Sequence, residues 1–382
     1  MLHLRKALSD NLFNPNYCRN LFCLYLRTKS GDGSGGFCWK TNREEEEEEG
    51  QIRLFKSRGQ HLLTNPRVLD AIIRASGVKP DDTVLEIGPG TGNLTLKLLE
   101  AAKKVVAVEI DSRMVEVLRK RAAAAGRGFD DRLDIIIGDA LRTEFPKFNL
   151  VVANIPYGIS SPLLAKLVYG ATENPFRSAT LLLQKEFARR LLAKPGDSEF
   201  NRLAVNVNLV ANVEFVMDVS KRDFVPCPRV DSSVVKIYPK SEIPNVDLDE
   251  WWAFTRTCFC KKNKTLGATF KQKRKLMELM KLSKFDLLSE DGNSEGREYD
   301  SNGDGDEEGF GSCLGSDNGV GILRRKIVSV LESGEFLDKR PSKLSNDDLL
   351  CLLFLFNEAG IYFSDQEKPK GGVCAAACGD LM

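Results

Sequence analysis

The chain has 382 residues, of which 42% are hydrophobic and 29% charged, and its formal net charge is +1 at pH 7. These values are typical of a globular protein with room for two domains, and we expect no membrane association because no apolar run reaches roughly 18 residues. Two histidines and ten scattered cysteines argue against a structural zinc site, and we expect no bound metal.

Residues 1–50 lack the pattern of a folded domain. Up to Gly31, basic residues alternate with leucine, phenylalanine and tyrosine, and Asp10 is the only acid. That composition is typical of an organelle transit peptide and predicts a mitochondrial location, although a disordered basic tail has the same composition. The run Glu44–Glu49 follows, and because like charges repel one another it predicts a solvated linker.

Residues 51–240 alternate short apolar runs with segments of helical periodicity. The runs expected to form buried strands are TVLEIG (83–88), KVVAVEI (104–110), LDIIIGD (133–139), LVVANIP (150–156) and ATLLLQ (179–184). Helices are expected at NPRVLDAIIRASG (65–77), NLTLKLLEAA (93–102) and SRMVEVLRKRAAAA (112–125), and further strands near AVNVNLVANVEFVMDV (204–219) and SSVVKIYP (232–239). This alternation predicts an α/β domain whose mostly parallel sheet is covered by helices on both faces.

Residues 241–382 carry a different pattern, with helices expected within 249–282, 323–333 and 345–360. Between them, residues 286–319 hold eleven acids and one base among many Gly, Ser and Asn residues, so we expect a flexible acidic insertion. Within it, Asp300, Asn302, Asp304 and Gly305 match a calcium-binding loop, but the twelfth position, which needs a glutamate, is Gly311. We therefore expect no calcium site there.

The run VLEIGPGTGNLT (84–95) joins a predicted strand to a predicted helix and contains Gly88, Gly90 and Gly92. Glycine permits tight turns and the close approach of a ligand to the backbone, but enzymes that bind dinucleotides use a similar loop. Glu86 precedes the glycines, where a carboxylate would repel a pyrophosphate and suit a ligand that carries an ammonium group. The loop therefore favours a nucleoside cofactor without phosphates.

Two further acids follow at the ends of the next two predicted strands. Glu109 stands where a carboxylate can accept hydrogen bonds from both ribose hydroxyls, and Asp139 stands where one can accept from an adenine amino group. Each acid alone is also explained as a solvated residue at the end of a strand. As an ordered set with Glu86, the three acids predict binding of S-adenosylmethionine in one crevice of a doubly wound sheet.

The run VVANIPYGIS (151–160) begins as a buried strand and ends in an amide, a proline and an aromatic ring. Its NIPY is a variant of the N/D/S-P-P-Y/F signature of amino-group methyltransferases, and with the following GISSPLL it resembles the ribosomal RNA adenine dimethyltransferase family. Two other runs, GQHLLTNPRVLDAI (59–72) and FVPCPRVDSSVV (224–235), are similar to motifs of that family in the same order. Farther along, KKNKTLGATFK (261–271) and LLFLFNEAGIYF (352–363) resemble its eukaryotic and archaeal branch.

The resemblance implies a Rossmann-like class I methyltransferase domain at residues 51–240, with a seven-stranded, mostly parallel sheet, and a small helical RNA-binding domain at residues 241–382. It also implies the reaction, in which S-adenosylmethionine supplies two methyl groups to N6 of each of two adjacent adenosines. The substrate would be the 3′-terminal hairpin of small-subunit ribosomal RNA. The protein would act on it as a monomer, on the pre-ribosomal small subunit. Kinship of the distal motifs with nucleolar enzymes makes the nucleus the alternative location.

Position by position, the resemblance assigns cofactor contacts to His61, Leu63, Gly88, Glu109, Asp139 and Asn154, and the target adenine to Asn154, Pro156, Tyr157 and Phe224, with Gln60 supporting the first motif. The Asn154 side-chain oxygen and the backbone carbonyl of Ile155 or Pro156 would accept the two N6 hydrogens and aim the nitrogen lone pair. Tyr157 and Phe224 would stack on the two faces of the base. A core aromatic ring and a hydrophobic plug are the structural alternatives for these two residues.

A dense basic group in the second predicted domain includes Lys261, Lys262, Lys264, Lys271, Lys273 and Arg274. Such groups bind RNA phosphates without reading sequence, although a solvated helix face has the same composition. Two rival functions are open. DNA and protein amino-group methyltransferases usually carry two prolines where this chain has Ile155 and Pro156, and some relatives of the family serve as organelle transcription factors or ribosome-assembly factors with methylation secondary.

Overall fold

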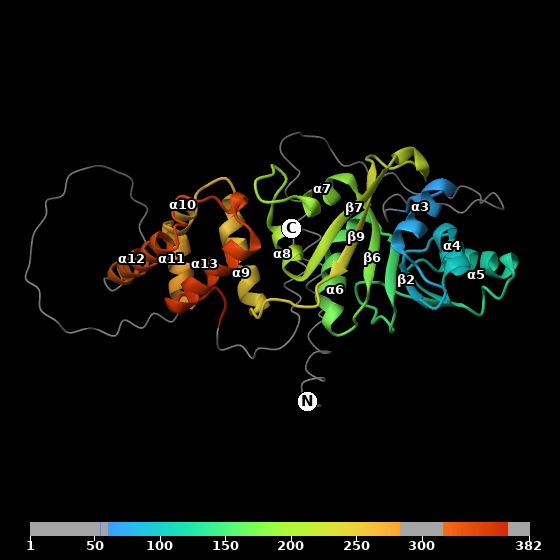
Figure 1. The fold of residues 1–382 in the computed structure, drawn as a ribbon, viewed down its shortest axis with the longest axis horizontal. Coiled ribbons are helices and arrows are strands. Elements are labelled where there is room, and N and C mark those ends of the chain that lie inside the picture. The colour runs from blue at the N-terminus through green and yellow to red at the C-terminus, as the bar shows by residue number, and fades with distance from the viewer. Residues whose placement is uncertain (1–53, 55–59, 283–315, 366–382) are drawn as a thin grey trace, which may run out of the picture. The chain divides into compact units, whose positions relative to one another are not determined.

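The computed structural model describes residue 54, residues 60–282 and residues 316–365. The chain divides into two compact units, with the boundary between Asn245 and Val246. Figure 1 shows a sheet flanked by helices in the first unit and an assembly of helices in the second. The predicted transit peptide and linker, and the calcium-like loop in the acidic insertion, lie outside the described residues.

A seven-stranded sheet organises the first unit. Its strands are β2 (Thr83–Ile87), β3 (Lys104–Glu109), β4 (Leu133–Ile137), β5 (Leu150–Asn154), β6 (Ser178–Gln184), β7 (Ala211–Val219) and β9 (Ser232–Pro239). Their order is β4-β3-β2-β5-β6-β9-β7, and β9 runs antiparallel to both of its neighbours while the other pairs are parallel. The predicted α/β fold with a mostly parallel sheet is confirmed.

Helices cover both faces of this sheet. In the described part of the first unit they are α3 (Pro66–Ser76), α4 (Asn93–Ala101), α5 (Ser112–Ala125), α6 (Ser160–Tyr169), α7 (Lys185–Leu192) and α8 (Arg202–Val210). In Figure 1, α3, α4 and α5 lie on one side of the sheet, and α6, α7 and α8 lie on the other. Strand residues such as Val84, Val105 and Leu150 are fully buried because both faces are covered.

The expectation of strands near residues 204–219 is wrong for the first half of that run and correct for the second. Residues Arg202–Val210 form the helix α8, and β7 begins only at Ala211. The run alternates apolar residues with asparagine, which imitates the period of a strand. However, nearly the whole helix is buried, and the Asn201 side chain caps it by accepting a hydrogen bond of 2.8 Å from the Leu203 amide.

A separate two-stranded sheet in the first unit joins two runs singled out in the sequence, the first motif, which the structure describes from Gln60 on, and the last motif, residues 224–235. The strand β1 (Leu62–Leu63) pairs antiparallel with β8 (Phe224–Val225), and Leu63 lies opposite Phe224. Next to it, the Thr64 amide donates a hydrogen bond of 2.9 Å to the Asp223 carbonyl. Residues 60–72 and 224–235 are therefore held together by these strands although they are far apart in the chain.

The second unit is helical in its described part: α9 (Leu248–Cys258), α10 (Leu266–Phe270), α11 (Lys273–Leu282), α12 (Ser316–Ser333) and α13 (Asn346–Glu358). Its core is aromatic, since the rings of Phe254, Phe270, Phe356 and Phe363 pack with centroids 5.0 to 6.3 Å apart, mostly edge to face. The acidic insertion was expected to reach Gly319, but α12 already begins at Ser316. No helix within 60–282 or 316–365 is long and apolar enough to cross a bilayer.

Candidate active site

The predicted site residues gather at the carboxyl ends of four neighbouring strands. Gly88 follows β2, Glu109 ends β3, Asp139 follows β4 and Asn154 ends β5. The parallel register places these ends side by side, and the strand order reverses between β2 and β5. Ligands of doubly wound sheets bind in the crevice at such a reversal.

The glycine loop packs closely against two other motifs. Gly88, Gly90 and Gly92 have φ angles of 66°, 57° and 89°, a region that other residues rarely adopt. A Cβ atom on Gly88 would lie 3.4 Å from the Cδ atom of Pro156, and one on Gly90 would lie 2.8 Å from a methyl carbon of Leu62. The loop, the NIPY run and the first motif therefore meet at one place.

Glu109 is 7% exposed and is held by the backbone around it. Its Oε2 atom accepts a hydrogen bond of 3.2 Å from the Gly90 amide, and its Oε1 atom accepts from the amides of Ile110 and Asp111 at 3.0 Å each. Burial raises the pKa of Glu109, and these three hydrogen bonds oppose the rise. A carboxylate has about four acceptor positions, so this one retains capacity for a ligand hydroxyl.

Glu86 is buried in β2, two residues before Gly88. Burial raises its pKa to about 8, and the neighbouring charge of Glu109 contributes in the same direction. Among the described residues, its Oε2 atom has no hydrogen-bond partner. A hydrogen bond with the Thr95 side chain opposes this rise in pKa. Because Glu86 is only 1% exposed, a ligand ammonium would meet its carboxyl only after a change in conformation.

Asp139 is half-buried in a turn that α6 anchors. Its Oδ1 atom accepts a hydrogen bond of 2.9 Å from the Leu141 amide, and Arg142 approaches Oδ2 to 3.8 Å. The Lys166 ammonium of α6 donates to the carbonyls of Ala140 and Leu141, at 2.8 and 3.3 Å, and to that of Thr143. A half-buried cation on these carbonyls fixes the turn and with it the Asp139 carboxylate.

Asn154 is oriented through His61. The Asn154 side-chain nitrogen donates a hydrogen bond of 3.1 Å to the His61 carbonyl oxygen. The His61 Nδ1 atom lies 2.7 Å from the Pro226 carbonyl oxygen, and since a carbonyl only accepts, Nδ1 carries the proton. Because the amide nitrogen is engaged, the Asn154 side-chain oxygen is the atom that stays available for a substrate N–H.

Tyr157 lies directly after this amide. Its hydroxyl is hydrogen-bonded to the Ser232 hydroxyl at 2.8 Å, and its ring stacks on the His61 ring with centroids 6.0 Å apart and an interplanar angle of 27°. Burial raises the pKa of Tyr157, so the phenol is neutral at physiological pH. The structure thus brings His61, Asn154, Pro156 and Tyr157 together.

Two residues assigned to the site are placed differently from the expectation. Phe224 is 2% exposed and Leu63 is 4% exposed, and both belong to the hydrophobic core around β1 and β8. The Phe224 ring therefore offers no open face to a base in this conformation, and the Leu63 side chain offers none to a cofactor. The backbone carbonyl of Leu63 accepts a hydrogen bond of 2.8 Å from Asn93.

The sequence patterns predicted no role at the site for Asp111 or Ile110. Asp111 is buried, accepts a hydrogen bond of 2.9 Å from the Gln60 side chain and pairs with Arg113 at 2.6 Å. It links the first motif to the segment that carries Glu109, and its place just before a helix was the available signal. Ile110 is 62% exposed beside Glu109, and an exposed aliphatic side chain there has no comparable signal in one sequence.

The basic residues predicted to bind RNA belong to one stretch of the second unit. They lie on the 3₁₀ turn Phe259–Lys261, on the turn before α10 and around the start of α11. Lys261, Lys264, Lys273 and Arg274 are exposed, whereas Lys262 and Lys271 are half-buried. In the described residues, no group of three or more His, Cys, Asp or Glu side chains is placed to hold a metal ion.

Known proteins that are similar to this chain point to one family. The family described as Ribosomal RNA adenine dimethylase matches residues 53–291. The mitochondrial ribosomal RNA small subunit methyltransferase of Arabidopsis thaliana is 60% identical over 328 residues, covering 84% of each chain. A protein of that plant named ribosomal RNA small subunit methyltransferase, without a location, is 46% identical over 335 residues, covering 83% of this chain and 94% of its own. The crystal structure of a dimethyladenosine transferase from Plasmodium falciparum is 40% identical with a TM-score of 0.64, and the match covers 79% of this chain and 99% of that one. The chain therefore belongs to the ribosomal RNA adenine dimethylase family.

Proposed function

We propose that this protein dimethylates N6 of adenosine in small-subunit ribosomal RNA and that S-adenosylmethionine is its methyl donor. The observation that carries the proposal is the orientation of Asn154 at the end of β5, beside the glycine loop. Its amide nitrogen is held by the His61 carbonyl, and its oxygen is left to accept from an amine. Family membership indicates the reaction, which is methyl transfer to adenine in ribosomal RNA. The orientation of Asn154 explains how the protein can position the amine that is methylated.

The chain's own residues position the amine. The Asn154 oxygen accepts one N6 hydrogen, and a backbone carbonyl next to it accepts the second. The Pro156 carbonyl already accepts a hydrogen bond of 3.0 Å from the Ile159 amide, which favours the Ile155 carbonyl for this role. These bonds draw the nitrogen lone pair out of the ring system and aim it at the methyl group. Because the Asn154 amide is neutral and takes up no proton, the proton that each methylation releases leaves to solvent.

The base and the cofactor would each meet an apolar side chain near these polar groups. Tyr157 would stack on the target adenine, whereas Phe224 would need to leave the core before it could contribute. The donor would supply an electrophilic methyl group, and Glu86, Glu109 and Asp139 would hold its ammonium group, its ribose and its adenine amino group in that order. Ile110, exposed beside Glu109, would lie against the adenine ring of the donor.

The proposal also includes which nucleotides are modified and in which compartment the protein acts. We infer that the substrate is the pair of adjacent adenosines in the 3′-terminal hairpin, modified by a monomer on the pre-ribosomal small subunit. The composition of residues 1–50 and the 60% identity to a relative named as mitochondrial support a mitochondrial location. A fluorescent fusion of residues 1–50 that stays out of mitochondria would contradict that location.

The decisive experiment measures N6,N6-dimethyladenosine by mass spectrometry in mitochondrial and cytosolic small-subunit RNA, with and without the protein. We expect the modification in mitochondrial RNA to disappear with the protein and to return with the wild-type chain but not with Asn154→Ala. Unchanged modification in both RNAs would reject the proposal. Normal ribosome assembly with Asn154→Ala would separate methylation from any assembly role.

A further inference from the structure

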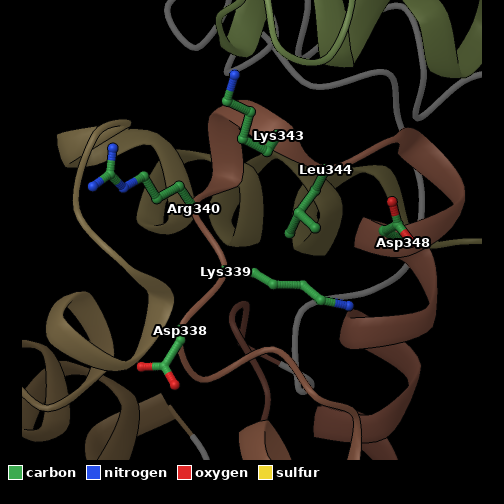
Figure 2. A pocket seen from close by; sticks show the side chains of 6 residues that line it. All are labelled: Asp338, Lys339, Arg340, Lys343, Leu344 and Asp348. Carbon is green, nitrogen blue, oxygen red and sulfur yellow. The ribbon is translucent and has the colours of Figure 1, made fainter.

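The second unit contains a hollow of about 520 Å³, lined by residues within 338–348 (Figure 2). The Lys339 ammonium lies 4.8 Å from the centroid of the Phe336 ring, and the Lys339 carbonyl accepts a hydrogen bond of 2.9 Å from the Leu266 amide. One Asp348 oxygen accepts from the Ser345 amide at 2.9 Å and from the Ser345 hydroxyl at 2.7 Å. The fold already uses these groups, whereas a polar network in the first unit reaches the candidate active site.

Arg121, on α5, holds the end of the glycine loop. Its Nη1 atom donates hydrogen bonds of 2.6 Å to the Thr91 carbonyl oxygen and of 2.7 Å to the Asn93 side-chain oxygen. Leu118, three residues earlier on α5, packs against the same loop, since a Cβ atom on Gly92 would lie 2.5 Å from its Cδ1 atom. Hydrogen bonds from a cation are stronger than neutral ones, so α5 fixes this part of the loop firmly.

Asn93, the first residue of α4, connects Arg121 to the first motif. Its side-chain oxygen accepts from Arg121, and its side-chain nitrogen donates a hydrogen bond of 2.8 Å to the Leu63 carbonyl oxygen. A guanidinium only donates and a carbonyl only accepts, so the amide satisfies both partners in one orientation alone. Arg121 therefore determines that an N–H of Asn93 faces β1.

Two asparagine side chains thus hold the backbone of the first motif. The His61 carbonyl accepts from Asn154, and the Leu63 carbonyl, two residues later, accepts from Asn93. Between them, Leu62 packs on the glycine loop, where a Cβ atom on Gly90 would lie 2.8 Å from its methyl carbon. Peptide units are planar and stiff, so a displacement at Leu63 is transmitted to the His61 carbonyl.

We propose that Arg121 and Asn93 are positioning residues for methyl transfer, and that they act through the Leu63 and His61 carbonyls on the Asn154 amide. The inference rests on the proposed function, because that function makes Asn154 the residue that meets the amine. Neither Arg121 nor Asn93 meets the RNA or the donor itself. Arg121 additionally holds the Thr91 carbonyl, and with it the loop against which the donor lies.

Asn93→Asp separates this role from a contribution to stability. The aspartate keeps an oxygen for Arg121 and gains its charge attraction, and an acid in the first turn of a helix is favourable. It has no N–H at neutral pH, so an oxygen would face the Leu63 carbonyl oxygen and displace β1. We therefore expect kcat to fall by about 10- to 100-fold, while the melting temperature stays within about 3 °C of wild type. A folded variant with the wild-type kcat would overturn the proposal.

Arg121→Met removes both hydrogen bonds of the guanidinium. It should lower kcat and also raise the Kd for S-adenosylmethionine, because the loop loses its hold at Thr91. Arg121→Lys keeps a cation that can reach one of the two oxygens and should recover part of each loss. Arg119→Met is the matched control, since Arg119 is exposed on the same helix, and it should stay within about twofold of wild type. Equal kinetics in the Arg121→Met and Arg119→Met variants would count against the role of Arg121.

A double-mutant cycle shows whether Asn93 acts through Asn154. Asn154→Asp already loses the hydrogen bond to the His61 carbonyl, so the position of that carbonyl no longer affects the side chain. Adding Asn93→Asp should therefore slow Asn154→Asp by no more than about twofold. If the two losses multiply, Asn93 acts by another route and the proposal is wrong.

A measurement without methyl transfer keeps this inference apart from the proposed function. In protein labelled with ¹⁵N at asparagine side chains, the Asn154 amide gives the NMR signal that is missing from Asn154→Asp. We expect this signal to shift in Asn93→Asp and Arg121→Met but not in Arg119→Met. An unchanged signal in folded Asn93→Asp overturns the inference whatever the activity. If the signal shifts as expected but wild type methylates no ribosomal RNA, the contacts stand and the proposed function is wrong.

Discussion

The Asn154 side-chain nitrogen donates a hydrogen bond of 3.1 Å to the backbone carbonyl of His61. His61 is itself held through Nδ1 by the Pro226 carbonyl at 2.7 Å. The orientation of one amide at the end of β5 therefore depends on the first motif and on the last motif, as well as on its own strand. Substitutions at Asn154 should reveal this dependence more clearly than substitutions at exposed positions.

Asn154→Asp is expected to lower kcat for methyl transfer by about a hundredfold, the usual cost of a misplaced positioning group. Aspartate has no N–H to donate, so its carboxylate would meet the His61 carbonyl oxygen as a second acceptor and turn away or take up a proton. Single-turnover methyl incorporation measures the rate, and filter binding should show little change in RNA affinity. A wild-type rate in this variant would show that the His61 contact does not orient the amide.

Tyr157 offers a pair of substitutions that separate its ring from its hydroxyl. Tyr157→Ala is expected to lower kcat/KM by about 5- to 150-fold, because stacking of a base on an aromatic ring contributes about 1–3 kcal/mol. Tyr157→Phe keeps the ring and loses only the Ser232 contact, so it should cost about 1 kcal/mol of stability with near wild-type kcat/KM. Equal losses in both variants would contradict the stacking role.

Much of the sheet could be predicted from the sequence because its strands are buried on both faces and therefore read as continuous apolar runs. The positions of Glu109 and Asp139 followed, since a polar residue after such a run marks the end of a strand.

The run 204–219 was predicted wrongly because its sequence pattern and its tertiary environment favour different structures. Its alternation has the period of a strand, whereas burial and the Asn201 cap, which only the tertiary structure supplies, produce a helix.

The parts of the site that could not be predicted depend on pairings between distant segments. Phe224 was assigned to the target base by its motif, but its place opposite Leu63 in a two-stranded sheet buries it. The contact between Leu266 and Lys339 is of the same kind, since neither residue carries a local signal for the other. One sequence gives residue types at a site, but long-range hydrogen bonds decide which side chains stay accessible.

Asp111→Asn tests the link between Gln60 and the Glu109 segment. The Arg113 guanidinium, with help from the Gln60 amide, holds the pKa of Asp111 well below its ordinary value of 3.8. A depressed pKa means that the ionised carboxylate stabilises the fold above the ordinary value, and that this contribution is lost as the pH falls toward the lower folded-state value. The variant should therefore melt lower than wild type, by a margin that is constant from pH 7 to about pH 5.

Below about pH 4 that margin should shrink, as far down as the fold survives, and differential scanning calorimetry across the pH series measures it. The same variant should raise KM for S-adenosylmethionine more than it changes kcat, because Asp111 positions the segment and does not meet the reacting atoms. A margin that grows on acidification would contradict the role of the ionised carboxylate.

Glu86→Gln is expected to stabilise the protein in the absence of cofactor, increasingly as the pH rises. Burial raises the pKa of Glu86 from 4.5 to about 8, so the folded state binds a proton more tightly than the unfolded state does. Between these two values the unfolded state binds fewer protons, and stability therefore falls with rising pH in wild type. Glutamine is neutral and removes that loss, so the two melting temperatures should be close near pH 5 and diverge toward pH 8.

The same substitution should weaken S-adenosylmethionine binding at and above about pH 8, where the Glu86 carboxyl ionises, because an ammonium group would lose its charged partner. A hydrogen bond to a charged group contributes about 1.5–3 kcal/mol, which predicts an increase in Kd of about 10- to 150-fold by isothermal titration calorimetry. Glu116→Gln, at an exposed position on α5, is the matched control and should change neither quantity. If Glu86→Gln binds the cofactor as tightly as wild type, the ammonium group does not contact Glu86. If the melting temperature of the variant equals that of wild type at every pH, the Glu86 carboxyl is not the group whose titration changes the stability.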